Sequence, residues 1–204
     1  MLIAIFTLIV LLFSIVIHEV AHGSVALSQG DTTAKYAGRL TLNPIKHLDP
    51  IGSVLLPLML LVLILITGQG FIFGWAKPVP VNPNHFKDRK WGELKVSIAG
   101  PAANFLIAIV FGLTIRFLPL SESLISLFSL ICIYNIVLGL FNLIPMPPLD
   151  GSHILFSFLP YRFSRFKIIL SQYGFFIVIL FLFFFGGIKL LFNASIAIFS
   201  MIAG

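Results

Sequence analysis

The sequence predicts an α-helical protein that crosses a membrane several times, with a re-entrant element and a small β-sheet near the cytoplasmic face. Of the 204 residues, 59% are hydrophobic and only 10% are charged, whereas a soluble domain usually carries about 25% charged residues. The hydrophobic residues are also gathered in long stretches. Because no polar stretch is long enough for an added soluble domain, we expect residues 1–204 to form a single membrane-embedded domain.

Six apolar stretches are candidates for membrane segments. A helical span needs about 20 residues, with about 17 as the lower limit. By this measure the first, third and fourth stretches are long enough, the second is at the limit, and the last is too short to assign alone. No Lys or Arg precedes His18 and no signal-peptidase site follows promptly, so we expect the first helix to be retained. The sequence predicts about five to six membrane segments, drawn from residues 2–27, 51–67, 96–118, 124–147, 168–185 and 190–202.

The basic residues predict which loops face the cytoplasm. Of the 13 Lys and Arg residues, 11 lie in three loops, at residues 28–50, 68–95 and 148–167. Only Arg116 and Lys189 remain for the opposite side. Since loops rich in Lys and Arg stay on the cytoplasmic side, we expect all three loops there. This pattern also explains the net charge of +6 without a nucleic-acid partner.

The stretch 51–67 joins two loops that are expected on the same side of the membrane, so it cannot be a simple single span. Either it enters the membrane and returns, helped by Pro57 and the Gly68-Gln69-Gly70 turn, or residues 71–81 make a second pass. Irregular backbone is tolerated at membrane depth only where it is buried in protein or lines a wet cavity. A re-entrant element beside a functional site would satisfy that condition.

Two loop segments are candidates for the small β-sheet. Residues 34–42 contain β-forming side chains, and the prolines between residues 78 and 83 exclude a helix in the segment 71–81 and favour an extended edge. We expect the two segments to pair against the membrane helices. An exposed edge at 34–42 or 71–82 could then bind an extended peptide by β-addition.

The most informative motif is His-Glu-Val-Ala-His at residues 18–22, which follows an apolar run. Histidines at i and i+4 lie one turn apart on one face of a helix, so His18 and His22 can bind one metal ion. Glu19 lies beside them, close enough to accept a proton from a water. The alternative, two buried histidines satisfied by other hydrogen bonds, would also bury Glu19 without a metal, which is costly. The motif predicts a metallopeptidase that acts in or near the membrane.

A catalytic zinc ion takes three protein ligands and keeps one position open for water, so one more ligand is needed. Asp150 is the acidic residue best placed, because it follows the stretch 124–147 and a proline-rich break that ends the helix. This stretch also ends on the side where the first one ends. The rival ligands are His47, Asp49 and His153, and we expect His153 to support the site or lie at the membrane interface rather than bind metal.

Further motifs accompany these residues: G-P-A-A-N at 100–104, N-L-I-P-M-P-P-L-D-G at 142–151, L-N-P-I-K-H-L-D-P-I-G-S at 42–53 and G-W-A-K-P-V-P-V-N-P at 74–83. With the motif at 18–22, they make the chain resemble the site-2 proteases, a family of intramembrane zinc metalloproteases. The resemblance covers about residues 10–160. It is to the compact form of the family, which lacks PDZ and CBS domains.

The resemblance implies specific roles. It assigns one Zn²⁺ per chain to His18, His22 and Asp150, makes Glu19 the catalytic base and acid, and gives substrate binding to Asn104 and Asn142. For the two asparagines, hydrogen bonding between helices is the alternative role. The implied function is a metalloendopeptidase in the cell membrane that cleaves the transmembrane segments of protein or peptide substrates near the cytoplasmic side of the lipid bilayer.

A second class of function is a non-catalytic zinc-binding membrane protein or a metal carrier. A carrier would need ligands distributed along a path across the membrane, whereas the candidate ligands here gather near one face. A site that only binds metal would also have no need of Glu19. The single cysteine, Cys132, excludes both a disulfide framework and a metal site built from cysteines.

Overall fold

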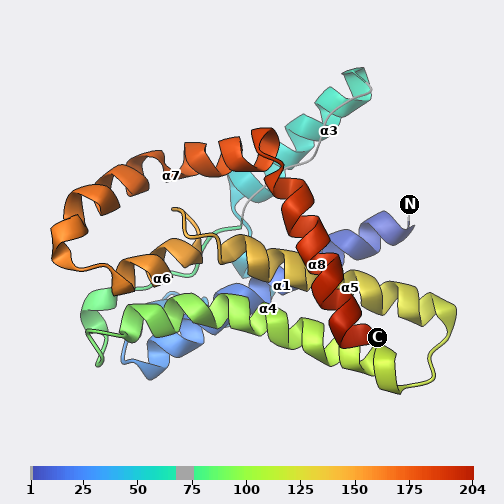
Figure 1. The fold of residues 1–204 in the computed structure, drawn as a ribbon, viewed down its shortest axis with the longest axis horizontal. Helices are drawn as coiled ribbons and strands as arrows, with labels where there is room; N and C mark the ends of the chain where they lie inside the picture. Colours follow the sequence, from blue (N-terminus) through green and yellow to red (C-terminus); the bar gives the residue numbers. More distant parts are fainter. Residues whose placement is uncertain (1, 68–75) are drawn as a thin grey trace.

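The computed structural model describes residues 2–67 and 76–204, and most of these residues are helical (Figure 1). Within the described residues, four helices contain spans that are long and apolar enough to cross a membrane: α1 (Leu2–Ser28), α4 (Gly92–Phe117), α5 (Glu122–Asn142) and α7 (Ser164–Phe184). Two apolar helices are shorter: α3 (Leu56–Thr67) and α8 (Gly187–Ala203). The prediction of an α-helical protein with several membrane spans is therefore confirmed.

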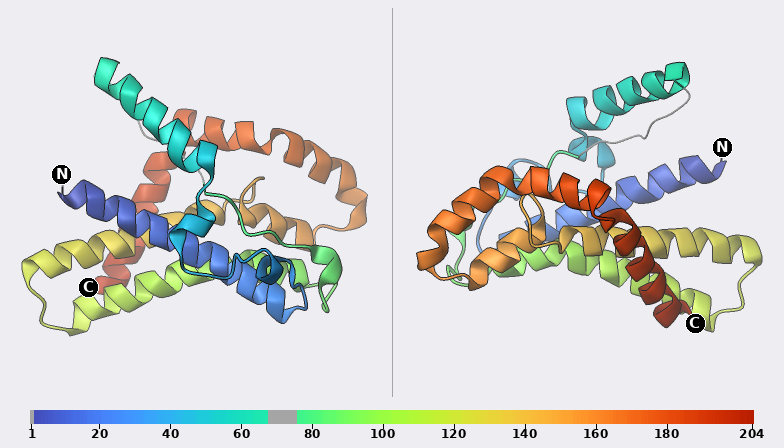
Figure 2. Two further views of the ribbon diagram at one scale, coloured as in Figure 1. Left: turned by 180° about the vertical axis from the view of Figure 1, so that it is seen from behind. Right: turned by 45° about the horizontal axis from the view of Figure 1, so that its top comes forward.

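The centre of the molecule is a three-helix core of α1, α4 and α5, and α8 crosses over α4 and α5 (Figures 1 and 2). Ala108 on α4 packs with Cys132 and Ile136 on α5, and all three side chains are fully buried. Aromatic and aliphatic side chains of α8 cover this cluster. In contrast, α3 projects away from the core in both views of Figure 2.

The helix ends follow from local sequence. Ser121 begins α5 by accepting a hydrogen bond from the backbone N–H of Leu124 through its side chain. The prolines after Ile144 prevent α5 from continuing, and the short helix α6 (Asp150–Phe158) begins beyond them. Asp49 accepts hydrogen bonds from two backbone N–H groups at the start of the π-helical segment η2 (Pro50–Leu55), which leads into α3.

The predicted strand over residues 34–42 is wrong at its start, because Thr33–Tyr36 form the short helix α2. Just before this helix, the side chain of Asp31 accepts hydrogen bonds from the backbone N–H and the hydroxyl of Thr33, a local turn that competes with an extended strand. The isolated β-bridge among the described residues pairs Leu48 with Ala76 in antiparallel sense. The predicted turn at 68–70 and residues 71–75 lie outside the described residues. As the prolines require, residues 76–82 contain no helix.

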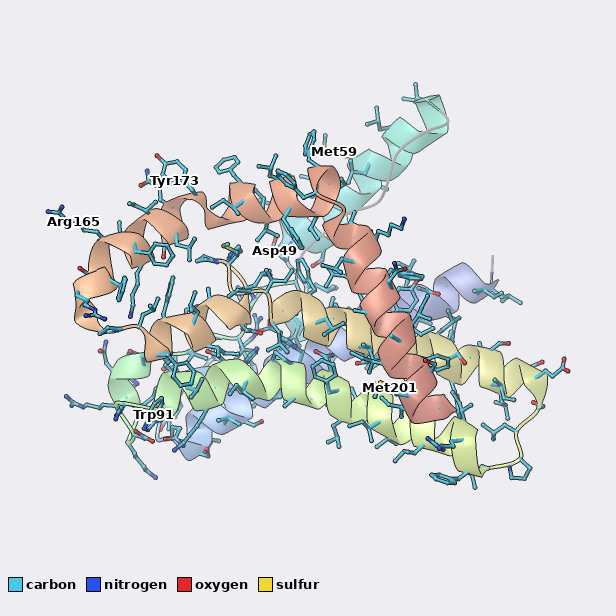
Figure 3. All side chains as sticks on the ribbon, viewed as in Figure 1. Asp49, Met59, Trp91, Arg165, Tyr173 and Met201 are labelled. Carbon is cyan, nitrogen blue, oxygen red and sulfur yellow. The ribbon has the colours of Figure 1, made fainter. Side chains whose placement is uncertain are left out.

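The basic loops gather at one end of the molecule. The backbone N–H of Lys87, before α4, donates to the carbonyl of Gln29, after α1, over 2.7 Å. Trp91 and Arg165 lie at this same end in Figure 3, and the side chain of Arg165 points away from the protein. The turn between α4 and α5 lies at the opposite end (Figure 1).

Candidate metal centre

The first component of the site is the histidine pair of α1. His18 and His22 are 6% and 8% exposed, and their Nε2 atoms lie 3.0 Å apart. The Oδ2 atom of Asp150, the first residue of α6, lies 3.1 Å from the Nε2 of His18 and 3.2 Å from that of His22. The ligand atoms of His18, His22 and Asp150 lie within 4.8 Å of one another, close enough to hold one metal ion. Within residues 2–67 and 76–204, this is the group of three His, Cys, Asp or Glu side chains that meets this condition.

The far nitrogen of each imidazole ring donates to an oxygen atom. The Nδ1–H of His18 donates to Oδ1 of Asn104 over 2.6 Å, and the Nδ1–H of His22 donates to the backbone carbonyl of Val96 over 2.7 Å. Since both partners can only accept, the proton of each neutral ring sits on Nδ1, and the Nε2 lone pairs face each other and Asp150. Three electron-pair donors this close together repel unless a cation lies between them. Two imidazoles and a carboxylate are a donor set that fits Zn²⁺.

Gly100 allows α4 to approach the histidine pair. A Cβ atom at this position would lie 2.3 Å from Nε2 of His22 and 2.6 Å from Nε2 of His18, which is closer than any side-chain carbon can come. Asn104 follows four residues later and so lies on the same face of α4. The motif at 100–104 thus provides both a close helix contact and the acceptor for His18.

Gly151 plays a similar part for the third donor. A Cβ atom on Gly151 would lie 2.3 Å from the carbonyl oxygen of Leu143 and 2.4 Å from that of Ile144. Only glycine therefore lets the first turn of α6 rest on the chain that leaves α5. This contact sets the position of Asp150 relative to the core helices.

The three donors open onto a cavity of about 370 Å³, which Glu19 and Asn142 also line. The extended segment 76–82 forms part of its wall through Pro78, Val79 and Val81. In this segment, the backbone N–H of Val79 donates to Oε2 of Glu19 over 2.6 Å. The carboxylate next to the histidine pair is therefore held at the cavity by the main chain of a loop.

Arg39 anchors the start of this extended segment. Its side chain is 7% exposed, and Nη2 donates to the carbonyl oxygens of Lys77, over 2.5 Å, and Pro78, over 3.3 Å. A guanidinium group can donate to two acceptors at once in a fixed geometry. The two carbonyls immediately before Val79 are fixed in this way.

Asp31 anchors the end of the segment. Its carboxylate is fully buried, accepts a hydrogen bond from the backbone N–H of Asn82 over 2.7 Å, and lies 3.1 Å from Nδ1 of His85. Burial by itself raises the pKa of Asp31, but the hydrogen bonds from Asn82, Thr33 and His85 outweigh it and lower the pKa to about 2. Asp31 is therefore a charged anchor at neutral pH.

The rival ligands His47 and Asp49 lie away from this group. His47 is fully buried, and its Nε2–H donates to the carbonyl of Thr41 over 2.9 Å. Asp49 is used at the start of η2, where its Oδ1 accepts from the N–H of Gly52 over 2.7 Å. Both side chains serve the local structure of the loop after α1.

His153 lines the cavity, one turn after Asp150 on α6. Its Nδ1 lies 2.8 Å from Oε1 of Glu93, at the start of α4, and both side chains are about half exposed. The hydrogen bond to Glu93 raises the pKa of His153 above its usual value, against the opposing effect of burial. The pair joins α6 to α4 beside the site.

The two asparagines occupy different positions. Asn142 lines the cavity, and its Nδ2 donates to the carbonyl of Leu138 over 3.0 Å within α5. Asn104 is fully buried behind His18 and is not part of the cavity wall. In the structure, Asn104 therefore contacts the histidine rather than the space open to a substrate.

Sequence reasoning missed Asn135, which is fully buried on α5 and accepts a hydrogen bond from Asn104 over 3.0 Å. A signal was present, because an amide inside an apolar membrane helix is costly unless it finds a partner. Arg39 and Asp31 were also missed as anchors. No pattern in the sequence around Arg39 or Asp31 indicates that the segment 76–82 contacts these two side chains.

A helical membrane protein in which two buried histidines, a partly buried aspartate and a glutamate meet at a cavity has the features of a membrane-embedded metallopeptidase. Comparisons identify the family within this class. Residues 118–181 match the family model of peptidase family M50. The chain is 42% identical over 165 residues to YwhC of Bacillus subtilis (strain 168), a match that covers 76% of this chain and 69% of YwhC.

Two further relatives support the same family assignment. Rip2 of Mycolicibacterium smegmatis is 32% identical over 173 residues, covering 84% of this chain and 64% of Rip2. MJ0392 of Methanocaldococcus jannaschii is 37% identical over 78 residues, covering 38% of this chain and 23% of MJ0392. All three relatives carry the words zinc metalloprotease in their names. None of the solved structures matches the chain. The chain belongs to peptidase family M50, the site-2 protease family of zinc metalloproteases.

Proposed function

We propose that the protein is an intramembrane zinc endopeptidase that cleaves transmembrane segments of other proteins near the cytoplasmic face, with residues 1–204 acting as a single domain. The observation that supports this most strongly is that His18, His22 and Asp150 converge at a cavity that Glu19 also lines. In this proposal, one zinc ion is held by the two Nε2 atoms and the Asp150 carboxylate.

Zinc, when bound, acts as a Lewis acid that polarises the scissile carbonyl and lowers the pKa of water toward about 7. Glu19 accepts a proton from the attacking water on a carboxylate oxygen and donates it to the amide nitrogen of the departing segment. The N–H of Val79 holds Oε2 of Glu19 and leaves Oε1 for this transfer. Asn104 and the carbonyl of Val96 keep the Nε2 atoms of the two histidines directed at the metal.

The substrate has to be extended when it is cleaved, because the carbonyls of an intact helix are bonded within the helix. A substrate helix therefore unwinds before it reaches Glu19. Of the two edges considered for β-addition, the segment 76–82 is the better candidate, since its residues Pro78, Val79 and Val81 line the cavity while residues 33–36 are helical. Asn142, on the cavity wall, is available to hydrogen-bond the extended main chain.

The proposed cytoplasmic orientation is supported by the basic loops, which gather at the end of the molecule where α1 ends and α4 begins. The re-entrant assignment of residues 51–67 belongs to the same proposal. Residues 51–67 are helical throughout, in η2 and the 12-residue helix α3. The support for a re-entrant path is therefore the expected placement of the loops before and after this segment on one side of the membrane.

Purified Glu19→Gln protein tests the proposal. Cleavage of a reconstituted transmembrane peptide should fall by at least about 10²-fold, the lower end of what general acid–base catalysis contributes. Zinc content should stay near that of the wild type because Glu19 is not a ligand. A wild-type protein that binds zinc but cleaves no transmembrane segment would favour the alternative, a non-catalytic zinc-binding protein or carrier. Loss of zinc in Glu19→Gln would show that Glu19 is a ligand.

A further inference from the structure

A buried chain of side-chain amides runs from His18 into the core. Asn104 on α4 accepts from Nδ1–H of His18 over 2.6 Å and donates from Nδ2 to Oδ1 of Asn135 on α5 over 3.0 Å. Asn104 also donates to the carbonyl of Ser14 on α1 over 3.3 Å. Asn135 in turn donates from its own Nδ2 to the carbonyl of Ile131 over 2.8 Å. The chain thus links all three core helices and ends on backbone carbonyls.

The partners of Asn104 permit one orientation of its amide. Its NH₂ group faces two acceptors, Oδ1 of Asn135 and the carbonyl of Ser14, while its oxygen faces the N–H of His18. In the flipped orientation, oxygen would face two oxygens and NH₂ would face an N–H donor, so all three hydrogen bonds would be lost. Both asparagines are fully buried, where an unpaired polar group costs about 1–3 kcal/mol.

The orientation of the Asn135 amide is also fixed by its hydrogen-bond partners. Its NH₂ group donates to the carbonyl of Ile131, one turn earlier in α5, which leaves Oδ1 to face Asn104. A backbone carbonyl can only accept, so the polarity of the whole chain is fixed from this end. Through Asn104, this polarity places the ring proton of His18 on Nδ1 and leaves Nε2 free.

We propose that Asn135 is a positioning residue for the metal site: through Asn104 it holds His18 in the tautomer and orientation that bind zinc. Asn135 touches neither the donor group nor the cavity, so its effect on the metal passes through Asn104. This inference rests on the proposed role of His18 as a zinc ligand. A positioning role can be told apart from ordinary helix packing. If Asn135 acts through Asn104, its substitution should have no effect on zinc affinity when Asn104 is already absent.

The experiment measures zinc affinity of the full-length protein in detergent by competition with a chelator. Asn135→Leu should weaken zinc binding about tenfold, at the lower end of the 10–100-fold effects of residues that orient metal ligands. Asn104→Ala should weaken it by about 10–100-fold, and the double variant should be no weaker than Asn104→Ala alone. Asn135→Asp should stay near the wild type, because a neutral carboxylic acid in this apolar site can still accept from Asn104 and donate to Ile131.

Cys132→Ala is the matched control. Cys132 lies one turn before Asn135 on α5, is fully buried, and donates to the carbonyl of Ala108 on α4 rather than to the amide chain. Its removal should leave zinc affinity unchanged. Should Asn135→Leu not be recovered as folded protein, Asn135→Ala carries the same comparison.

Three results would overturn the proposal: unchanged zinc affinity in Asn135→Leu, effects of the Asn104 and Asn135 changes that add in full, or an Asn135→Asp protein as weak as Asn135→Leu. The His18→Ala variant distinguishes a wrong role for Asn135 from a wrong ligand assignment at His18. If His18→Ala keeps full zinc affinity, the ligand assignment is wrong. If it loses zinc while Asn135→Leu does not, only the role of Asn135 is wrong.

Discussion

Two separate polar networks hold the site, and they are built from different chemistry. Behind the histidines, within the three-helix core, the network consists of the uncharged amides of Asn104 and Asn135. In front of Glu19, at the loop end of the molecule, it consists of the charged side chains of Arg39 and Asp31, which fix the extended segment 76–82.

The difference is explained by where each network lies along the helices. Asn104 and Asn135 occupy the interior of apolar spans, where an ionised group would carry a far larger desolvation cost than an amide. Asp31 and Arg39 lie beyond the end of the first span, where their charges meet main-chain groups and His85. Neutral hydrogen bonds therefore orient the proposed metal ligands, and charge-assisted ones hold the loop that contacts the proposed base.

The largest effect is expected where the core network meets the donor group. Gly100→Ala should abolish detectable zinc binding and cleavage, because the added Cβ would lie 2.3 Å from Nε2 of His22 and 2.6 Å from Nε2 of His18, so both proposed ligand atoms would have to move. Zinc content measured by elemental analysis tests this. Gly112→Ala on the same helix is the control, since its Cβ would lie 2.6 Å from Cγ2 of Ile202, a comparable crowding that does not involve the histidine pair. Full zinc in Gly100→Ala would mean that α4 does not fix the histidine pair.

The loop network should affect catalysis without affecting the metal. Arg39→Met removes charge-assisted hydrogen bonds to the carbonyls of Lys77 and Pro78, each worth about 1.5–3 kcal/mol. We expect kcat/KM for a transmembrane peptide to fall about tenfold, with zinc content unchanged. Lys46→Met, at an exposed lysine of the same loop, is the control. Loss of zinc in Arg39→Met would show that the two networks are not separate.

The smallest effect is expected at the pair of Glu93 and His153, which is half exposed. The raised pKa of His153 means that its stabilising contribution is fully present below about pH 6.5, the unfolded value, and is lost as the pH rises through the folded pKa. Glu93→Gln should therefore lower the thermal stability at pH 6 by at most about 1 kcal/mol and have almost no effect at pH 9. An equal loss at both pH values would assign Glu93 a role independent of the charge on His153.

The sequence predicts most of the helices because hydrophobic length alone defines a membrane span. The predicted start of the third span, residue 96, is late, since Glu93 and Lys95 hide the first turn of α4 (Gly92–Phe117). The predicted stretch 124–147 extends past the end of α5, because apolar side chains continue beyond Asn142 although the proline-rich turn does not allow a helix.

The candidate site also has parts that the sequence predicts and parts that it does not. The spacing of His18 and His22 fixes their geometry within one helix, and the proline break made Asp150 the best third candidate. The partners of Asn104 and Glu19 could not be predicted, because they depend on which faces of α4 and α5 meet α1 and on the return of the segment 76–82. These contacts join residues more than thirty positions apart, and no local pattern records them.

The most direct test of the whole account is the zinc content of purified Asp150→Ala protein, measured beside Asp49→Ala and His47→Ala. The account predicts that Asp150→Ala loses most of its zinc and its cleavage activity, because three ligands become two. The other two variants should keep zinc near the wild-type level, since their side chains serve the loop after α1. Full zinc in Asp150→Ala together with loss of zinc in His47→Ala would contradict the account and make His47 the third ligand.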